Sequence, residues 1–349
     1  MAMRTPRNKV HATRWKRAVS IEEIARRAEV SRTTVSMVLN GKGDAYRISS
    51  TTQARVIGLA DELNYAPNPS ARNLRLQRSF VIGLVLSDFS NVFFSQLAKH
   101  LERYCRENGY LLQISDSNDD EKVEEDLIRG FVARSVDGLI LATSHNDSAF
   151  LAEIAANTPT IFVDRRVEGD HCSWVTSDNY ESTRRAVSLL VQAKPREIVY
   201  IGGLKGLSSS IERRSAYGDT LRAAGMPIRR SLILERDYTT EWGRQAMQKI
   251  RKKLGRNPDA LFTASYTLLE GALTALRSES TLLPNDVLIA TYDDHPLLNF
   301  IQPPIHSVEQ DCEEIAHRCF SALERLIDDS SVVVRETVPA KLHVRGTEG

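Results

Sequence analysis

The sequence predicts an all-α helix-turn-helix head followed by an α/β body of two lobes with parallel sheets. Three observations lead to this fold class. Short amphipathic segments lie before residue 66, and from about residue 79 apolar runs of strand length alternate with helical segments. Charge is also unevenly spread, because residues 1–80 carry 15 Lys and Arg against 6 Asp and Glu, whereas the remainder carries 31 against 39. A basic head favours a polyanionic partner, although a solvated basic tail has the same composition.

Three predicted helices make up the head, which we expect to span residues 19–66. The first lies in "SIEEIARRAEV", where Ser20 is the predicted N-cap and a glutamate three residues later completes a capping box. The second lies in "SRTTVSMVLNG", between Ser31 as N-cap and an Asn-Gly pair that ends the helix. The third is expected over about 50–64. Residues 1–18 hold six basic side chains, no acidic one and no clear periodicity, which predicts a disordered basic arm.

The second helix has the polarity of a helix that enters the major groove of DNA. Its apolar positions are expected to pack on the first helix, while its outward face offers an arginine, several hydroxyls and no carboxylate. Arginine can bond the O6 and N7 atoms of guanine, and hydroxyls reach phosphates or base edges. Two short helices, a tight turn and a third helix in a basic segment predict a helix-turn-helix, although a plain polar surface would look similar. The residues expected at the DNA are Ser31, Arg32, Thr33, Thr34, Ser36, Met37, Asn40 and Arg47.

Polar residues follow the predicted strands of the body. About 265 residues are too many for one sheet of ordinary size, so we expect two similar lobes. Ligands of parallel α/β sheets bind at the carboxyl ends of the strands, and these ends predict one cleft if the lobes face each other. The predicted strand ends are Asp88-Phe89, Thr143-Ser144, Asp164-Arg165, Gly202-Gly203, Thr263 to Ser265 and Tyr292-Asp293-Asp294.

Two arginines are the best candidates for an anion-binding group in this cleft. Arg165 follows the predicted strand "TIFVD" and Arg213 follows "GGLKGLSSSIE", and a guanidinium can hold a phosphate or carboxylate with two hydrogen bonds. The serines before Arg213 lie beside a predicted helix N-terminus, which also favours an anion. Asp293 and Asp294 suit sugar hydroxyls and would repel a phosphate. Each residue alone could be a cap or a surface ion pair, and their joint placement at strand ends favours a polyol site.

Most of the chain resembles the LacI/GalR family of repressors. The resemblance runs through "IEEIARRAEVSRTTVSMVLNG" and "ELNYAPNPSARNLR" and then through the body to about residue 345. The segments "SRTTVSMVLNGKGDAYRIS", "ALFTASYTLLEG" and "LLNFIQPP" resemble most the branch of fructose repressors (catabolite repressor/activator) and sucrose repressors. The resemblance implies a periplasmic-binding-protein type I body over 79–345. Its N-lobe is expected at about 79–176 and 308–329, and its C-lobe at about 177–307 and 330–345.

Residues 67–78 form the predicted linker between head and body. Pro67 and Pro69 end the third helix, and "PSARNLRL", which begins at Pro69, can form a short helix. The resemblance implies that this hinge helix pairs with its dimer mate in the minor groove, where a leucine wedges between two base steps. A loose linker in the free protein is compatible with folding on DNA. The linker residues expected at the DNA are Asn68, Ala71, Arg72 and Leu74.

The resemblance also implies where a small-molecule effector binds. In the family the residue at Arg213 holds the effector, and in the fructose branch the pair at Asp164-Arg165 joins it. Ser265-Tyr266 stand where the wider family carries Asn-Asp, a departure that the branch shares, whereas Asp293 stands where the branch tends to have Gly. The expected effector residues are Asp88, Asn91, Phe93, Phe94, Ser144, Asp164, Arg165, Asp178, Ser208, Ser210, Arg213, Ser265, Tyr266, Asp293 and Asp294.

Together these features predict a cytoplasmic, sequence-specific transcriptional regulator of sugar metabolism, either a repressor or also an activator. Its expected partners are a double-stranded, pseudo-palindromic DNA operator and a sugar phosphate such as fructose 1-phosphate, with neutral sucrose or fructose as the alternative effector. A homodimer is expected over a tetramer, because no leucine heptad follows residue 345. A sugar-binding transport protein would share the body, but the basic head and the lack of a signal peptide oppose it.

Several other classes are opposed by the sequence. G-x-S-x-G, H-E-x-x-H and Walker A motifs are missing, which argues against an enzyme. No apolar run approaches the roughly 18 residues of a membrane span. The four cysteines include no C-x-x-C pair, so neither a metal nor another cofactor is expected. Cys312, His317 and Cys319 are close in sequence, a pattern more typical of a buried helix face than of a zinc site.

The linker pattern yields a prediction about the hinge. Leu74→Ala should weaken operator binding and leave effector binding unchanged, because an apolar wedge acts only on bent DNA. Fluorescence anisotropy measures the first property and calorimetry the second. An unchanged operator affinity, together with an unbent complex, would remove Leu74 from the mechanism.

Overall fold

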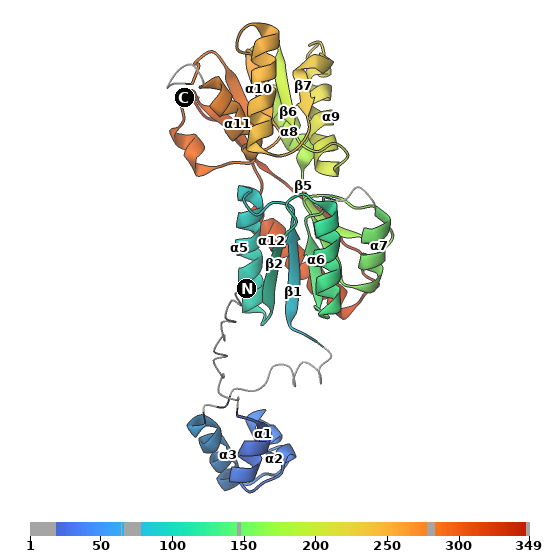
Figure 1. Ribbon diagram of the computed structural model, residues 1–349, viewed down its shortest axis with the longest axis vertical. Coiled ribbons are helices and arrows are strands. Elements are labelled where there is room, and N and C mark those ends of the chain that lie inside the picture. The colour runs from blue at the N-terminus through green and yellow to red at the C-terminus, as the bar shows by residue number, and fades with distance from the viewer. Residues whose placement is uncertain (1–18, 64, 66–77, 145–147, 278–282, 347–349) are drawn as a thin grey trace, which may run out of the picture. The chain divides into compact units, whose positions relative to one another are not determined.

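The computed structural model describes residues 19–63, 65, 78–144, 148–277 and 283–346. The chain divides into two compact units, with the boundary between residues 77 and 78 of the sequence (Figure 1). The predicted basic arm and most of the predicted linker lie outside the described residues. The same holds for the expected DNA contacts Asn68, Ala71, Arg72 and Leu74.

The first unit is a three-helix head, α1 (Ile21–Arg27), α2 (Arg32–Leu39) and α3 (Ser50–Glu62). A serine caps each helix, because the hydroxyls of Ser20, Ser31 and Ser49 accept hydrogen bonds from backbone amides in the first turns. Ile24 and Val35 are fully buried in the small core that the three helices share. The apolar spacing that predicted the helices therefore also supplies their core.

Two six-stranded sheets build the body (Figure 1). The N-lobe sheet has the order β11-β5-β4-β3-β1-β2, and the C-lobe sheet has the order β12-β10-β9-β8-β6-β7. Every pairing is parallel except that of β10 with β12. The N-lobe strands are β1 (Val81–Leu86), β2 (Leu111–Asp116), β3 (Gly138–Leu141), β4 (Thr160–Val163), β5 (Ser173–Ser177) and β11 (Arg335–Val338). The C-lobe strands are β6 (Ile198–Gly202), β7 (Ile233–Glu235), β8 (Ala260–Thr263), β9 (Leu288–Tyr292), β10 (Ile305–Glu309) and β12 (Lys341–His343).

Helices cover both faces of each sheet. On β1 of the N-lobe, Ile82 and Leu84 pack with α5 and α12, whereas Val85 faces α6 and α7 on the other side. The N-lobe helices are α5 (Val92–Glu107), α6 (Glu121–Ala133), α7 (Ser148–Asn157) and α12 (Cys312–Asp328). The C-lobe helices are α8 (Asn179–Gln192), α9 (Ser208–Ala223), α10 (Thr240–Leu254) and α11 (Tyr266–Leu276), with short 3-10 turns η1 (Arg230–Leu232) and η2 (Pro296–Phe300). Among the described residues, no helix combines the length and apolar character needed to cross a bilayer.

The chain crosses between the lobes three times, after β5, after β10 and after β11. One predicted boundary is wrong: residues 330–345 are expected in the C-lobe, but β11 pairs with β5 in the N-lobe sheet, and only β12 pairs with β10 in the C-lobe sheet. Val334 and Val338 are buried in the N-lobe core, which explains why this strand stays there. The last crossing therefore comes after residue 338. The second comes after residue 309, because β10 remains in the C-lobe sheet until Glu309.

Helices α10 and α11 approach each other at two glycines. A Cβ atom on Gly271 would lie 1.9 Å from the carbonyl oxygen of Thr240, and one on Gly243 would lie 2.2 Å from that of Leu268. Both contacts are to backbone atoms, which cannot swing aside. These glycines therefore fix how closely the two helices pack.

Gly271→Ala should destabilise the body, because the added methyl group meets backbone rather than a flexible side chain. Overpacking of this kind costs roughly 1–3 kcal/mol, and the melting temperature should fall by roughly 2–10 °C. Gly218→Ala in α9 is the control, since its nearest neighbour is the movable guanidinium of Arg214 at 3.3 Å. Calorimetric melting that shifts equally for both variants would contradict this account of α10 and α11.

Candidate functional site

The outward face of α2 presents polar groups, as predicted. Arg32 and Thr33 are exposed in the first turn, and Ser36 and Met37 are partly buried one turn later. The helix contains no acidic residue that would repel a phosphate backbone. Its inward side packs through Val35 and Val38, both buried. The face predicted for DNA is therefore available on the surface of the head.

Two of the residues predicted to contact DNA also cap the ends of α2. The Ser31 hydroxyl accepts a hydrogen bond from the Thr34 amide at 3.0 Å, and the Asn40 side chain donates to the Ser36 carbonyl at 2.6 Å. Arg47 is exposed in the loop that follows, where it has a left-handed φ of 52°. The caps thus bring a hydroxyl to the start of the helix and an amide to its end, and the loop after the helix adds an exposed guanidinium.

Arg32 is held by the neighbouring helix. Its Nη2 atom lies 2.8 Å from the Glu22 carboxylate of α1, with the two side chains 70% and 55% exposed. The carboxylate lowers the freedom of a long side chain without burying it. Arg32 is also the first residue of α2, the end at which side chains of recognition helices contact base edges.

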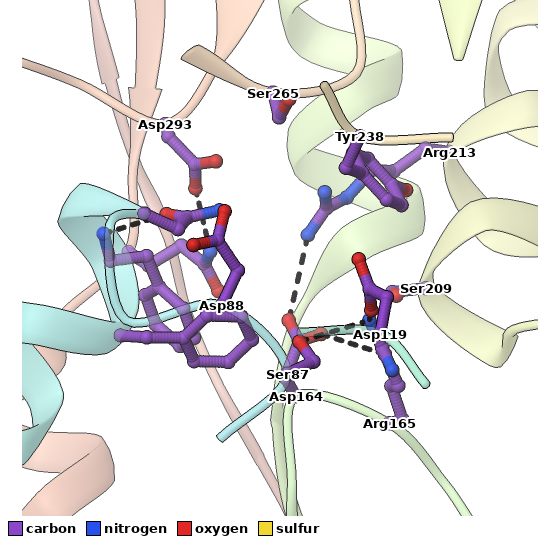
Figure 2. A pocket seen from close by; sticks show the side chains of 14 residues that line it. Ser87, Asp88, Asp119, Asp164, Arg165, Ser209, Arg213, Tyr238, Ser265 and Asp293 are labelled. Carbon is purple, nitrogen blue, oxygen red and sulfur yellow. Dashed lines mark hydrogen bonds and ion pairs between the residues drawn. The ribbon is translucent and has the colours of Figure 1, made fainter. Parts of the chain in front are cut away.

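A cleft lies where the strands of the two lobes end (Figure 2). It encloses about 410 Å³ of space between atoms, its open mouth included. Nine of the predicted effector residues line it: Asp88, Asn91, Phe93, Phe94, Asp164, Arg165, Arg213, Ser265 and Asp293. The structure therefore brings strand ends of both lobes to one cavity, as the rule for parallel sheets predicts.

The two arginines converge on Asp164 from opposite lobes (Figure 2). Arg165 follows β4 in the N-lobe, and its Nε lies 3.5 Å from one Asp164 oxygen. Arg213 of α9 in the C-lobe places Nη2 3.8 Å from the other oxygen. All three residues are buried. Both distances exceed those of direct charge-assisted hydrogen bonds, so the shared carboxylate offsets only part of the two positive charges and leaves hydrogen-bond donors of both guanidiniums directed at the cleft.

Other contacts fix the orientation of the arginines. Arg213 donates through Nε to Asn179 at 2.8 Å and through Nη1 to the Ala264 carbonyl at 2.8 Å, and its guanidinium lies 3.5 Å from the ring centre of Tyr292. Arg165 donates to the Thr143 carbonyl, while its Nε has no hydrogen-bond partner among the described residues. The remaining donors, Nη2 of Arg213 and Nε of Arg165, are oriented toward Asp164.

Carboxylates outnumber guanidiniums in the cleft. Asp88, Asp119, Asp164 and Asp293 line it together with Arg165 and Arg213, a formal sum of −2. Burial raises the pKa of the Asp293 carboxyl, and the facing Arg213 only partly opposes this. Burial also raises the pKa of Asp119. The cleft is therefore rich in hydrogen-bond acceptors of the kind that hold sugar hydroxyls.

Asp164 and Asp293 share a backbone conformation that L-residues seldom adopt. Their φ angles are 68° and 67°, and each is the first residue after a strand, β4 and β9 respectively. Asp is among the residues that tolerate this left-handed region best. Sharp turns at equivalent positions of the two sheets thus aim both carboxylates into the same cleft.

The other six predicted effector residues do not line the cleft. Asp294 instead accepts hydrogen bonds from Ser307 at 2.5 Å and Arg345 at 2.7 Å, because it points away from the side taken by Asp293. Asp178 caps α8, and the Tyr266 ring stacks on His295. Ser144, Ser208 and Ser210 bond Asp119, the Arg166 amide and the Tyr238 hydroxyl, respectively. The three serines support cleft residues or their neighbours and remain candidates for indirect roles.

Five cleft residues were missed by the sequence analysis. Ser87 and Asp119 adjoin strand ends, and Ser209 lies between two serines that were chosen, so the strand-end rule could have found them. Tyr238 follows β7, a strand of three residues that is too short to recognise from alternation. Gln310 lies in the second crossing and depends on the lobe topology.

Two further groups bear on metal chemistry. Among the described residues, ligand atoms of Asp294, Glu309 and His343 lie within 4.8 Å of one another. Arg345 already pairs with Asp294, and His343 lies 2.7 Å from Glu309, so these contacts form an ion-pair network.

On α12 the prediction of a buried face is wrong for His317, which is exposed while Cys319 is buried, because the two residues lie on different sides of the helix.

Comparison with known proteins decides the family. Residues 20–68 match the model for bacterial regulatory proteins of the lacI family, and residues 187–347 match that for the periplasmic binding protein-like domain. The chain is 33% identical to the sucrose operon repressor of Klebsiella pneumoniae over 94% of this chain and 98% of that protein. The protein belongs to the LacI family. It is a DNA-binding transcriptional regulator, which confirms the prediction that it is not an enzyme.

Further relatives of this LacI-family protein agree. The catabolite repressor/activator of Salmonella typhimurium is 33% identical over 89% of this chain and 93% of that protein. The crystal structure of the Cra transcriptional dual regulator from Pseudomonas putida in complex with fructose 1-phosphate has a TM-score of 0.71 and 28% identity, covering 77% of this chain and 99% of that chain. The Lac repressor dimer bound to operator and an anti-inducer shares the fold, with a TM-score of 0.78, 23% identity and coverage of 93% and 98%. The predicted fold class is confirmed.

The geometry of α2 yields a prediction on specificity. Arg32→Ala should weaken operator binding by roughly 1–3 kcal/mol, mostly at one base pair, because a bidentate contact to a base is lost. Arg26→Ala is the matched control, since Arg26 is also exposed and paired with a glutamate but lies on α1. Anisotropy on operator variants and random DNA measures both. If Arg32→Ala weakened operator and random DNA equally, Arg32 would be only a phosphate contact.

Proposed function

We propose that the protein controls operons of sugar metabolism from the cytoplasm and leaves its operator when a phosphorylated fructose binds between the lobes. The observation that carries the proposal is the convergence of Arg165 and Arg213, from opposite lobes, on one buried point of the cleft. Relatives named for sucrose and fructose operons, and the Cra structure with fructose 1-phosphate, support this effector class.

The phosphate is assigned to the arginine side of the cleft. There its oxygens accept hydrogen bonds from the N–H groups of both guanidiniums that lack a close partner. Each such charge-assisted hydrogen bond is worth roughly 1.5–3 kcal/mol. Helix α9 also begins at this wall with Leu207 as N-cap, which offers no side-chain oxygen to its first amides. Ser209 in that first turn lines the cleft. Uncapped amides and the helix dipole favour an anion at such an end.

The sugar ring is assigned to the opposite side. Asp88 and Asp293 accept hydrogen bonds from hydroxyls there, and Asn91 and Ser265 can donate as well as accept. Phe93 and Phe94 supply an apolar surface for the ring's C–H groups. The excess of carboxylates is the observation that favours a neutral sugar as the second candidate effector, because a phosphate adds negative charge to a sum of −2.

Release of the operator follows from linkage. An effector that contacts both lobes favours the closed cleft, and it weakens DNA binding only if the closed state binds operator less well. We assign that difference to the predicted hinge helices, which pair on DNA only when the N-lobes of a dimer are suitably placed. A dimer is supported by exposed apolar groups on the edge strand β2, where Leu111 is 66% and Ile114 38% exposed.

Calorimetry of the full-length protein tests the effector. Fructose 1-phosphate, fructose 1,6-bisphosphate, fructose 6-phosphate, fructose and sucrose should be titrated under identical conditions. At least one phosphate ester should bind more tightly than both neutral sugars. If a neutral sugar bound tightly and none of the phosphate esters bound, the phosphate assignment would be overturned. The protein would then be a regulator that responds to a neutral sugar.

Arg213→Ala should give a regulator that binds its operator and is no longer released by the effector. Arg213→Lys should restore effector binding only in part, because lysine lacks the planar fork of donors. Arg214→Ala is the matched control, since Arg214 is the next residue of α9 but lies outside the cleft. Gel shifts with and without effector measure release. Full release of the Arg213→Ala variant would contradict the role given to this guanidinium.

A further inference from the structure

A second contact joins the lobes beside the effector cleft. Arg166 follows β4 in the N-lobe, and its Nη1 atom lies 2.8 Å from a carboxylate oxygen of Glu212, which belongs to α9 of the C-lobe. The two side chains are 33% and 19% exposed. Neither residue lines the cleft. The pair therefore connects the lobes through protein atoms alone and leaves the effector space open.

Arg166 is anchored at more than one point. Its backbone amide donates to the Ser208 hydroxyl, also on α9, at 2.7 Å. Its guanidinium lies 4.8 Å above the ring centre of Trp174 in β5 of its own lobe. Because these contacts already restrict the side chain, the pair with Glu212 forms with less loss of freedom than an ordinary surface ion pair.

The contact is continuous with the cleft on both lobes. Arg166 is the neighbour of Arg165, and Glu212 is the neighbour of Arg213. The side chain of Asn179, the first residue of α8, accepts from Nε of Arg213 at 2.8 Å. A change in the distance between the lobes must therefore move the cleft arginines and this contact together.

We propose that Arg166, Ser208 and Glu212 form an interlobe latch that sets the fraction of closed cleft before any effector binds. If a ligand binds only to the closed cleft, its apparent affinity falls in proportion to the fraction of protein in which the cleft is closed. The latch thereby sets how much effector is required to release the operator. The effect of the latch on operator release rests on the proposed function, whereas the latch itself does not.

Hydrogen exchange of the full-length protein, without ligand or DNA, tests the latch directly. Glu212→Gln keeps the shape of the side chain and removes its charge. Amides of 164–168 and 207–212 should exchange faster, by roughly three- to tenfold, because loss of a partly buried pair shifts the lobes toward opening. Core amides of β3 and β8 should be unchanged. Glu241→Gln is the matched control, since Glu241 pairs with Arg244 inside one helix of the C-lobe.

Two results would overturn the latch. Unchanged exchange at the interlobe amides means that the pair does not hold the lobes, and faster exchange throughout β3 and β8 means that it only stabilises the fold. The exchanged pair Arg166→Glu with Glu212→Arg should recover part of the protection that each single variant loses. If the interlobe amides of the double variant were no better protected from exchange than those of either single variant, a direct pairing of the two side chains would be contradicted.

Effector and operator titrations then separate the two proposals. Glu212→Gln should bind fructose 1-phosphate several-fold more weakly and need correspondingly more of it for release, while Glu241→Gln behaves as the wild type. If exchange rises as expected but fructose 1-phosphate does not bind the wild type, the latch stands and the effector assignment fails.

Discussion

The body depends on the Asp164 carboxylate, which lies between a guanidinium of each lobe. Buried cations are strongly destabilising unless a counter-charge accompanies them, and Asp164 serves both Arg165 and Arg213 at 3.5 and 3.8 Å. The turn that places it follows β4 with a φ of 68°. Two facing sheets can therefore bring two arginines to one point, where Asp164 lies beside both guanidiniums and Asp119, 3.7 Å from Nη2 of Arg165, adds a second counter-charge.

The cleft is also connected to the segments that join the lobes. Gln310, in the second crossing, donates to Asp293 at 2.7 Å and accepts from Ser177 at 2.5 Å, at the end of β5 before the first crossing. A ligand that contacts Asp293 therefore acts on a residue that is hydrogen-bonded to Gln310 in the second crossing and, through Gln310, is linked to Ser177 at the start of the first crossing. Together with the latch at Arg166, this gives a physical route by which a small molecule changes how the lobes are placed.

Much of this site could be predicted from the sequence, because caps and strand ends have local signals. Ser20 and Ser31 cap their helices as the pattern predicts, and Arg165 lies in the cleft because it directly follows a strand end, whereas Arg213 reaches the cleft from α9, the helix after β6. What failed depends on tertiary context. Asp294 turns away from its neighbour toward Arg345, Tyr238 follows a strand of three residues, and β11 joins the N-lobe sheet because its valines are buried there.

Binding of an effector in the interlobe cleft is proposed to lower the affinity of the protein for its operator. The most direct test of this proposal is the dissociation constant of the wild-type protein for its operator, measured by fluorescence anisotropy with and without saturating fructose 1-phosphate. The account predicts that the ligand weakens operator binding by about 5- to 150-fold, the usual range of coupling between two sites. An operator affinity that stays the same or rises while the ligand is bound would contradict it.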